Sequence, residues 1–368
     1  MHYHIILTEL CDSRCKYCYE KSLQEFSNGL EEKFEFDFSA PTKSNIKTED
    51  LKKFLKNDPS PTLIFYGGEP LLEIEKIKEI IDAFPKLPFR MQTNAKLLDK
   101  LPIDYLNKIG KLLISIDGDK SRTDLNRGEG TYKKVLENIK KARDQGYAGE
   151  IVARMTISFP DIYPQVQHLI QLQKVFDSVH WQLDVAFYKF DFNEEKFQEF
   201  SKKYNKEISK LIDFWIENLE KGKVIKIYPF LGIINRLLGF DSETRLMCGA
   251  GHSGYAITTG GKIQACPIMN NIKNFECGNL ESEQLKKIDL IEPCTSCEES
   301  SICGGRCLYS NHAKLWGEKG EKMICDNTKH LILKLRKNLP KIKELLDKKI
   351  ISQENLEYEK YFGPEIIP

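Results

Sequence analysis

Cysteines are the residues of this sequence whose number and spacing point most directly to chemistry. The 368-residue chain contains eleven, an odd number that cannot pair completely as disulfides within one chain. They lie in two separate groups, whereas cysteines used only as small core residues would not be segregated in this way. Such groups are typical of metal-binding or catalytic sites in a reducing compartment. The groups are Cys11, Cys15 and Cys18, and then Cys248, Cys266, Cys277, Cys294, Cys297, Cys303, Cys307 and Cys325.

The N-terminal group has the spacing C-x3-C-x2-C, which suits an iron–sulfur cluster. Cysteine thiolates are the usual ligands of such clusters, and three on one loop can hold three irons of a [4Fe–4S] cube and leave one iron open to a substrate. The alternatives are a zinc site that lacks a ligand and three incidental thiols. Structural zinc takes four ligands, and no histidine lies nearby in the sequence to complete the set.

The C-terminal group contains the run C-x2-C-x5-C-x3-C from Cys294 to Cys307. Paired C-x2-C ligands are common in four-cysteine zinc sites, and two closed zinc sites would use eight thiolates. Iron–sulfur clusters take the same ligands. From these residues alone, zinc and iron–sulfur chemistry are equally open.

Parallel strands and helices are predicted to position the first group. Up to about residue 230, short apolar runs alternate with helical patterns, which is typical of βαβ units. About six such units would make an open or partial barrel, whose chemistry lies at the C-terminal ends of the strands. The strands are predicted at Tyr3–Thr8, Thr62–Tyr66, Phe89–Thr93, Leu112–Ile116, Ile151–Ile157, Val179–Ala186 and Val224–Ile227. The helices are predicted at Thr48–Leu55, Leu72–Phe84, Tyr132–Asp144, Tyr163–Val175 and Asn193–Leu219.

The remainder of the chain has a different character. It is rich in Cys, Gly and short turns, and Thr259–Gly261 predicts a β-hairpin turn. Thr328–Lys349 predicts a Lys-rich helix that Pro340 kinks or splits. The fold class is therefore α/β, with a partial (β/α)6 TIM-like barrel, a small Cys-rich domain and a C-terminal helical tail.

Composition excludes several classes of protein. Lys and Arg number 55 and Asp and Glu 54, for a net charge of +1, which gives no support to nucleic-acid binding or membrane-surface binding through bulk charge. No run approaches the ~18 apolar residues of a membrane span. The N-terminus lacks the pattern of a secretory signal, so the expected location is the cytoplasm.

Two further motifs accompany the first cysteine loop. Tyr66-Gly67-Gly68-Glu69-Pro70 follows the second predicted strand, and Ser115-Ile116-Asp117-Gly118 ends the fourth. Together the three motifs resemble the radical S-adenosylmethionine (SAM) superfamily over about residues 1–230. The resemblance implies a partial (β/α)6 barrel, a [4Fe–4S] cluster on Cys11, Cys15 and Cys18, and SAM chelated to its open iron. An electron from this cluster would cleave SAM to a 5′-deoxyadenosyl radical that abstracts hydrogen from the substrate.

The resemblance also implies the SAM contacts. Backbone groups around Gly67, Gly68 and Glu69 would bind the amino group, and Tyr17 would flank the adenine. Ser115 and, more loosely, a further set would contact the ribose or carboxylate, although ordinary turn or ion-pair roles are the alternative for some of these. That further set is Asn94, Asp117, Arg127 and Arg154.

The C-terminal cysteines resemble a SPASM domain, an extension of radical SAM enzymes that carries two auxiliary [4Fe–4S] clusters. The resemblance implies domains at 1–235, 240–330 and 331–368. A distal cluster would be held by Cys294, Cys297, Cys303 and Cys325. The cluster nearer the substrate would be held by Cys248, Cys266 and Cys307. Cys277 would be its fourth ligand, or else that cluster has an open iron.

SPASM enzymes mostly oxidise or crosslink peptides and proteins, so the resemblance implies an anaerobic peptide-modifying oxidoreductase that forms thioether or C–C bonds. Its partners would be a peptide or protein and an electron donor such as ferredoxin or flavodoxin. The alternatives are formylglycine formation as in sulfatase maturases, a small-molecule or quinone-cofactor pathway, and a zinc-binding adaptor. No catalytic acid or base is identified. Weaker candidates are His252 near a cysteine and a strand end that would line the barrel mouth, namely Trp181, Gln182 and Asp184.

Overall fold

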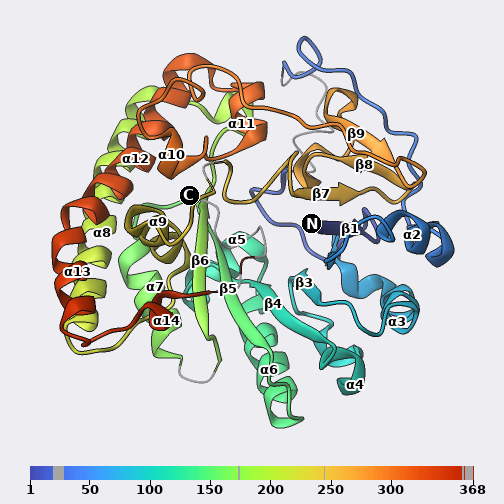
Figure 1. Ribbon diagram of the computed structural model, residues 1–368, viewed down its shortest axis with the longest axis horizontal. Helices are drawn as coiled ribbons and strands as arrows, with labels where there is room; N and C mark the ends of the chain where they lie inside the picture. The colour runs from blue at the N-terminus through green and yellow to red at the C-terminus, as the bar shows by residue number, and fades with distance from the viewer. Residues whose placement is uncertain (20–28, 173–174, 244, 359, 361–367) are drawn as a thin grey trace. The chain divides into compact units, whose positions relative to one another are not determined.

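The computed structural model describes residues 1–19, 29–172, 175–243, 245–358, 360 and 368. The chain forms two compact units (Figure 1). Unit 1 comprises Met1–Arg154, Gln173–Asp177 and Gly249–Asp289, and unit 2 comprises Met155–Leu172, Ser178–Cys248 and Leu290–Pro368. The Cys-rich segment after residue 240 is shared between both units, and the domain boundaries at 1–235, 240–330 and 331–368 stay a prediction.

Unit 1 is built on the barrel strands β1 to β5. Adjacent strands are parallel in the order β5-β4-β3-β2-β1, and β2 is buried along its whole length, as expected for a parallel strand covered on both faces. β7 pairs in parallel with the other edge of β1, and β8 and β9 follow antiparallel. The strands are β1 His2–Ile6, β2 Thr62–Tyr66, β3 Phe89–Thr93, β4 Ile109–Ser115, β5 Glu150–Ile157, β7 Gly254–Ile257, β8 Lys262–Gln264 and β9 Glu276–Asn279.

The helices of unit 1 connect these strands, and in Figure 1 α3, α4 and α6 lie along one side of them. Their apolar residues face the sheet, as Ile77, Ile80 and Ile81 of α3 illustrate. The helices are α2 Thr48–Leu55, α3 Ile74–Ala83, α4 Ile103–Leu106, α5 Lys120–Arg127 and α6 Thr131–Asp144, with 3-10 turns η1 Pro70–Glu73, η2 Leu98–Lys100, η4 Pro267–Met269 and η5 Lys273–Phe275.

Unit 2 is mainly helical. β5 enters it from Met155 onward, and β6 follows β5 at the end of the sheet. Its core contains Trp181, Trp215 and Phe230, whose rings pack edge to face with centroids 5.6–5.7 Å apart. Its elements are α7 Ile162–Gln171, β6 Ser178–Leu183, η3 Lys189–Asp191, α8 Glu194–Leu219, α9 Tyr228–Leu238, α10 Ser300–Cys303, α11 Leu308–Ala313, α12 Gly317–Lys337, α13 Leu339–Asp347 and α14 Gln353–Leu356.

The predicted fold class is confirmed, and most predicted elements are present. The hairpin turn joins β7 and β8. Pro340 lies in the first turn of α13, which begins at Leu339 after α12 has ended at Lys337. The strand predicted at Val224–Ile227 is wrong, since this segment forms a single bridge between Val179 and Ile227. Trp215 Nε1 donates a hydrogen bond to the Ile225 carbonyl (2.9 Å), and α9 starts directly afterwards at Tyr228. The segment is therefore too short to form further strand pairing.

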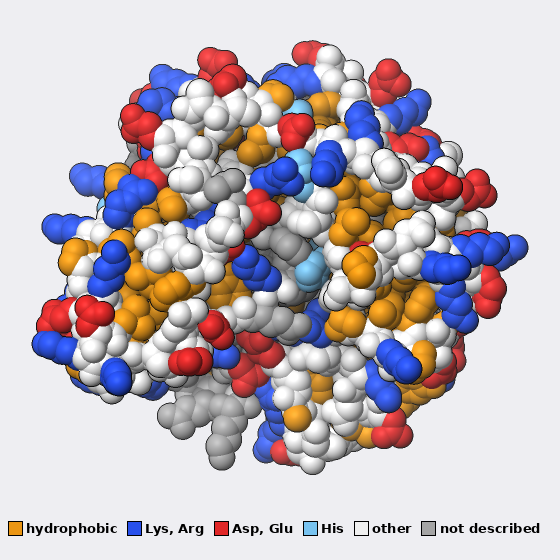
Figure 2. Space-filling model, in the orientation of Figure 1, with side chains coloured by type: hydrophobic (Ala, Val, Ile, Leu, Met, Phe, Trp, Pro, Cys, Tyr) orange, Lys and Arg blue, Asp and Glu red, His pale blue; other side chains and the backbone are white. Residues whose placement is uncertain are grey.

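The surface is consistent with the charge balance of the sequence. Figure 2 shows acidic and basic side chains interspersed over the visible face. Among the helices that the structure describes, none is long and apolar enough to cross a membrane.

Candidate iron–sulfur and cofactor sites

The first cysteine loop directly follows β1 and is tied down by backbone hydrogen bonds. The amides of Gly68 and Glu69 donate to the carbonyls of Thr8 and Leu10 (2.8 Å each), and the amide of Lys16 donates to the carbonyl of Asn126 (3.0 Å). All three cysteines of the loop reach solvent at least in part. The fold therefore presents them together at the C-terminal end of β1.

Gly67 and Gly68 allow the chain to approach itself at this point. A Cβ atom at Gly67 would lie 2.4 Å from the Thr8 carbonyl oxygen, and one at Gly68 would lie 2.3 Å from the Leu10 carbonyl oxygen. Gly67 also has a φ of +144°, which favours glycine. The close approach that these glycines permit is to the protein's own backbone, at the base of the cysteine loop.

Glu69 joins the ends of β2 and β3. Its carboxylate is 1% exposed and accepts hydrogen bonds from Thr93 Oγ1 (2.6 Å), the Asn94 amide (2.8 Å) and the Leu71 amide (3.0 Å). Burial raises the pKa of Glu69 to about 7, although these hydrogen bonds act in the opposite direction. Its side chain thus holds the strand ends in register beneath the loop.

Asn94 reaches from the end of β3 into the cysteine loop itself. Its Nδ2 donates to Asp12 Oδ1 (2.6 Å) and Ser13 Oγ (3.1 Å), which lie between Cys11 and Cys15. Asn94 therefore fixes the loop between two of the predicted iron ligands. Sequence reasoning missed the polar residues inside this loop as partners.

Asp117 is the centre of a buried network that holds Tyr17. Arg127 forms a two-pronged ion pair with its carboxylate (2.8 and 3.1 Å), and Asn126 Nδ2 donates to it (3.2 Å). The Tyr17 hydroxyl donates to the same carboxylate, and the Arg127 guanidinium lies 5.4 Å from the centre of the Tyr17 ring. Burial raises the pKa of Tyr17 well above its usual range. Three of the predicted cofactor contacts are thus joined to one another.

Ser115 and Arg154 form a separate pair of candidates. They lie opposite each other in the register of β4 and β5, and both are partly exposed. Arg154 also interacts electrostatically with the buried His4 on β1, where burial lowers the histidine pKa to about 3. Ser115 therefore lies at the end of β4, and Arg154 lies beside it within β5.

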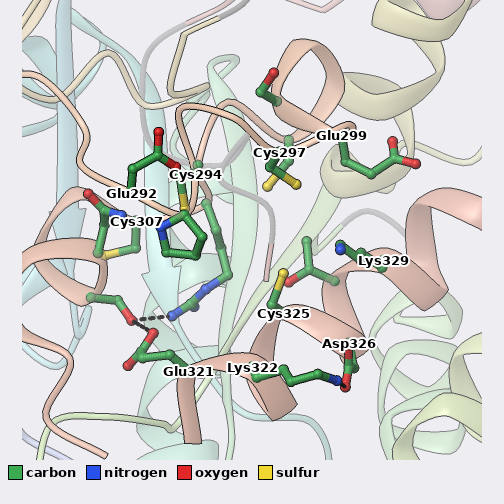
Figure 3. Close-up of a pocket in the computed structure, with 18 of the residues that line it drawn as sticks. Glu292, Cys294, Cys297, Glu299, Cys307, Glu321, Lys322, Cys325, Asp326 and Lys329 are labelled. Atoms are coloured by element: carbon green, nitrogen blue, oxygen red, sulfur yellow. Dashed lines mark hydrogen bonds and ion pairs between the residues drawn. The ribbon is translucent and has the colours of Figure 1, made fainter. Parts of the chain in front are cut away.

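A second candidate site is a cavity of about 790 Å³ in unit 2. Cys303 ends α10, Cys307 precedes α11 and Cys325 lies on α12. In Figure 3 the sulfur atoms of Cys294, Cys297 and Cys325 point toward a common space. The cysteines that line the cavity are Cys294, Cys297, Cys303, Cys307 and Cys325.

The donor chemistry of this cavity fits an iron–sulfur cluster, whose ligands bind different irons and so surround a volume. Burial raises the pKa of Cys303 to about 12, and the charges of Cys294 and Cys325 act in the same direction, whereas the charge of Arg306 acts against it. Loading the site with iron must therefore release protons. Among the residues that the structure describes, no three His, Cys, Asp or Glu side chains are grouped as ligands of a single metal ion.

The remaining cysteines are divided between the units. Cys248 and Cys307 belong to unit 2, and Cys266 and Cys277 to unit 1. Cys277 lies on β9 with 3% exposure, its thiol hydrogen-bonded to the Phe275 carbonyl (3.5 Å). Burial raises its pKa to about 12. Cys277 thus occupies a core position, and the ligand set of the near cluster stays a prediction.

The weaker candidates have local roles. His252 forms an ion pair with Asp289 at 3.0 Å when it is protonated. Trp181 is fully buried and its Nε1 donates to the Tyr204 hydroxyl (2.8 Å), so its prediction as a residue of the barrel mouth is wrong. Gln182 and Asp184 are partly exposed at the end of β6.

The sequence and the fold are similar to those of known proteins. Residues 5–172 match the Radical SAM superfamily. The chain is 24% identical over 371 residues to Radical SAM cyclopropyl synthase TigE of Paramaledivibacter caminithermalis, covering 90% of this chain and 73% of TigE.

The fold is similar to two solved proteins. One is anSMEcpe with bound AdoMet, with a TM-score of 0.71, 18% identity, and coverage of 96% of this chain and 97% of that one. A further anSMEcpe structure holds AdoMet and the Cp18Cys peptide, with a TM-score of 0.65, 18% identity, and coverage of 93% and 99%. The other protein is Streptococcus suis SuiB bound to S-adenosylmethionine, with a TM-score of 0.53, 16% identity, and coverage of 83% and 70%. At these identities the likeness shows the fold.

Proposed function

Since this chain is a radical SAM enzyme with a Cys-rich C-terminal region that fits a SPASM domain, we propose that it oxidises or crosslinks a peptide or protein substrate. Cys11, Cys15 and Cys18 would hold a [4Fe–4S] cluster, which with SAM supplies the 5′-deoxyadenosyl radical that abstracts a substrate hydrogen. The protein's part is to position these groups and to exclude water.

One observation supports this proposal most strongly. Asn94 at the end of β3 and Asp117 after β4 hydrogen-bond to the cysteine loop and to the tyrosine within it, and the Glu69 carboxylate after β2 accepts from the Asn94 amide. Such a loop is held in place before any cofactor binds, which lowers the cost of ordering it. Ser115 at the end of β4 and Arg154 opposite it on β5 would contact the SAM ribose or carboxylate.

The proposed substrate class rests on the similar proteins. TigE is a cyclopropyl synthase, and anSMEcpe has been solved with a bound peptide. By extension, we infer a peptide or protein substrate in which a C–C or thioether bond is formed, with loss of two hydrogens. Cys294, Cys297, Cys303 and Cys325 would hold a distal auxiliary cluster that passes the surplus electron toward a ferredoxin or flavodoxin. A near cluster would use Cys248, Cys266 and Cys307.

The experiment is to purify the protein anaerobically and to measure iron, sulfide and reductive SAM cleavage. We expect about twelve irons with matching sulfide, as three [4Fe–4S] clusters require. Cys11→Ala and the matched variant Cys303→Ala should each lose one cluster and keep about eight irons. Cys11→Ala should abolish SAM cleavage, whereas Cys303→Ala should still cleave SAM. Bound zinc without sulfide, or SAM cleavage by Cys11→Ala, would contradict the proposal.

A second measurement addresses the substrate. Candidate short peptides are incubated with the enzyme, SAM and reductant, and analysed by mass spectrometry. A loss of two hydrogens supports oxidation or crosslinking. SAM cleavage without any mass change in peptides that bind the enzyme would argue against the peptide class.

A further inference from the structure

A tight left-handed turn separates Cys303 from Cys307 at the edge of the unit 2 cavity. Gly304, Gly305 and Arg306 have φ values of +64°, +92° and +55°. The glycines are needed sterically, because a Cβ at Gly304 would lie 2.2 Å from the Arg245 carbonyl oxygen and one at Gly305 would lie 2.3 Å from Leu290 Cδ1. Arg306 adopts the same left-handed region with a full side chain, which is unfavourable for a residue that carries a Cβ.

This turn directs the Arg306 side chain into the cavity. Arg306 lines the cavity together with its cysteines, and its charge interacts with the thiols of Cys294, Cys303 and Cys325. Its guanidinium is anchored, since Nη2 donates to Ser310 Oγ (2.9 Å). The strain at Arg306 thus accompanies a cation fixed among three of the four predicted ligands of the distal cluster.

A carboxylate lies at the far end of the same hydrogen-bond chain. Ser310 Oγ donates to Glu321 Oε2 (2.7 Å), and Figure 3 shows this link in dashed lines beside the labelled Glu321. Glu321 is partly buried and lines the cavity. Arg306 and Glu321 therefore lie at the two ends of one hydrogen-bond chain through Ser310, and the Arg306 charge acts on the thiols of Cys294, Cys303 and Cys325.

Other charges at the cavity are arranged differently. Lys322 pairs with Asp326 at 2.9 Å, and their side chains are 75% and 53% exposed. Glu299 pairs with Arg336 at 2.7 Å. Solvent strongly screens the exposed Lys322–Asp326 pair, and the charges of the part-buried Glu299–Arg336 pair largely cancel each other. Lys329 also lines the cavity, and its charge acts on Cys325.

We propose that Arg306 is a positioning residue that raises the reduction potential of the distal auxiliary cluster, with Glu321 opposing it. The inference rests on the proposed function. A thiolate-ligated cluster gains one negative charge when it takes up an electron, and no bond changes. A cation held close to it in a partly desolvated site therefore favours the reduced form.

The test is a redox titration followed by electron paramagnetic resonance. The background is the full chain with Cys11→Ala, Cys15→Ala, Cys18→Ala and Cys266→Ala, which leaves the distal cluster as the proposed iron site. Arg306→Met should lower the ratio of reduced to oxidised cluster at fixed potential about tenfold, equal to about 59 mV for a one-electron couple. Arg306→Lys should retain most of the ratio, and Glu321→Gln should raise it.

Lys322→Met is the control, because it removes a cation from the exposed rim, and it should change the ratio less than about twofold. The inference would be overturned if Arg306→Met and Arg306→Lys had the same ratio of reduced to oxidised cluster. It would also be overturned if Glu321→Gln lowered this ratio. If Arg306→Met does not bind iron, the direction in which Glu321→Gln changes the ratio of reduced to oxidised cluster decides whether the inference holds. A background protein that binds no iron overturns the proposed distal cluster, and the inference with it. If Arg306→Met binds iron and its ratio of reduced to oxidised cluster is unchanged, the inference is overturned while the proposed distal cluster stands.

Discussion

The two cysteine sites are held in place in different ways. The N-terminal loop is held by side chains from strand ends, chiefly Asn94 and the buried pair of Asp117 and Arg127. The unit 2 cavity is enclosed by turns, the four-residue α10 and the helix α12, with thiols pointing toward a common space. The first site is thus preorganised by hydrogen bonds, whereas the second has a hollow interior that a bound cluster would fill. The difference suggests that the second site depends more on its cofactor for local stability.

Removal of iron should produce the largest contrast. When a site forms only around its metal, binding free energy is folding free energy. In protein stripped of iron anaerobically, amide hydrogen exchange over residues 290–307 should accelerate about tenfold or more. Exchange at the ends of β2 and β3 should change far less. Hydrogen-exchange mass spectrometry checks this, and equal acceleration at both sites would remove the distinction.

Breaking the Asp117 network should have the next largest effect. Asp117→Ala leaves the buried Arg127 guanidinium without its counter-charge, which costs about 3–5 kcal/mol of unfolding free energy. Asp99→Ala is a matched control, because Asp99 pairs with Lys134 and Lys141 at 3.5 Å on the surface, and such pairs contribute about 0–1 kcal/mol. Urea unfolding of apo protein measures both. If both variants lost similar amounts of unfolding free energy, the Asp117 network would contribute no more to stability than surface ion pairs do.

Asn94→Ala should have a more local effect. It removes the hydrogen bonds to Asp12 and Ser13 while leaving all three cysteines in place. Loss of a hydrogen bond to a charged group costs about 1.5–3 kcal/mol, so we expect about a tenfold or greater weakening of SAM binding, with iron content retained. Equilibrium binding of SAM to reconstituted protein measures the change. Asn107→Ala, at the exposed end of α4, is the control and should bind normally.

The sequence predicted those features that depend on local pattern. The apolar runs located β2 and β3 at their observed bounds, and the three motifs located the cysteine loop. Long-range relations could not be predicted, because Tyr17 and Asp117 lie 100 residues apart and nothing in their spacing shows that they share a hydrogen bond. Arg306 was missed for a similar reason. Its left-handed backbone depends on packing around Gly304 and Gly305, while the motif treats the position as variable.

Cys277 gives the smallest expected effect and decides how the eleven cysteines are divided. Its position on β9, with the thiol against the Phe275 carbonyl, is that of a small core residue. Cys277→Ala should therefore keep all iron with unchanged cluster spectra and lower the unfolding free energy by about 1 kcal/mol. Cys266→Ala is the control, since it should lose one cluster. If Cys277→Ala also loses a cluster, it is the fourth ligand of the near cluster. If it does not, that cluster has an open iron, and a substrate with a thiol becomes the preferred class to test.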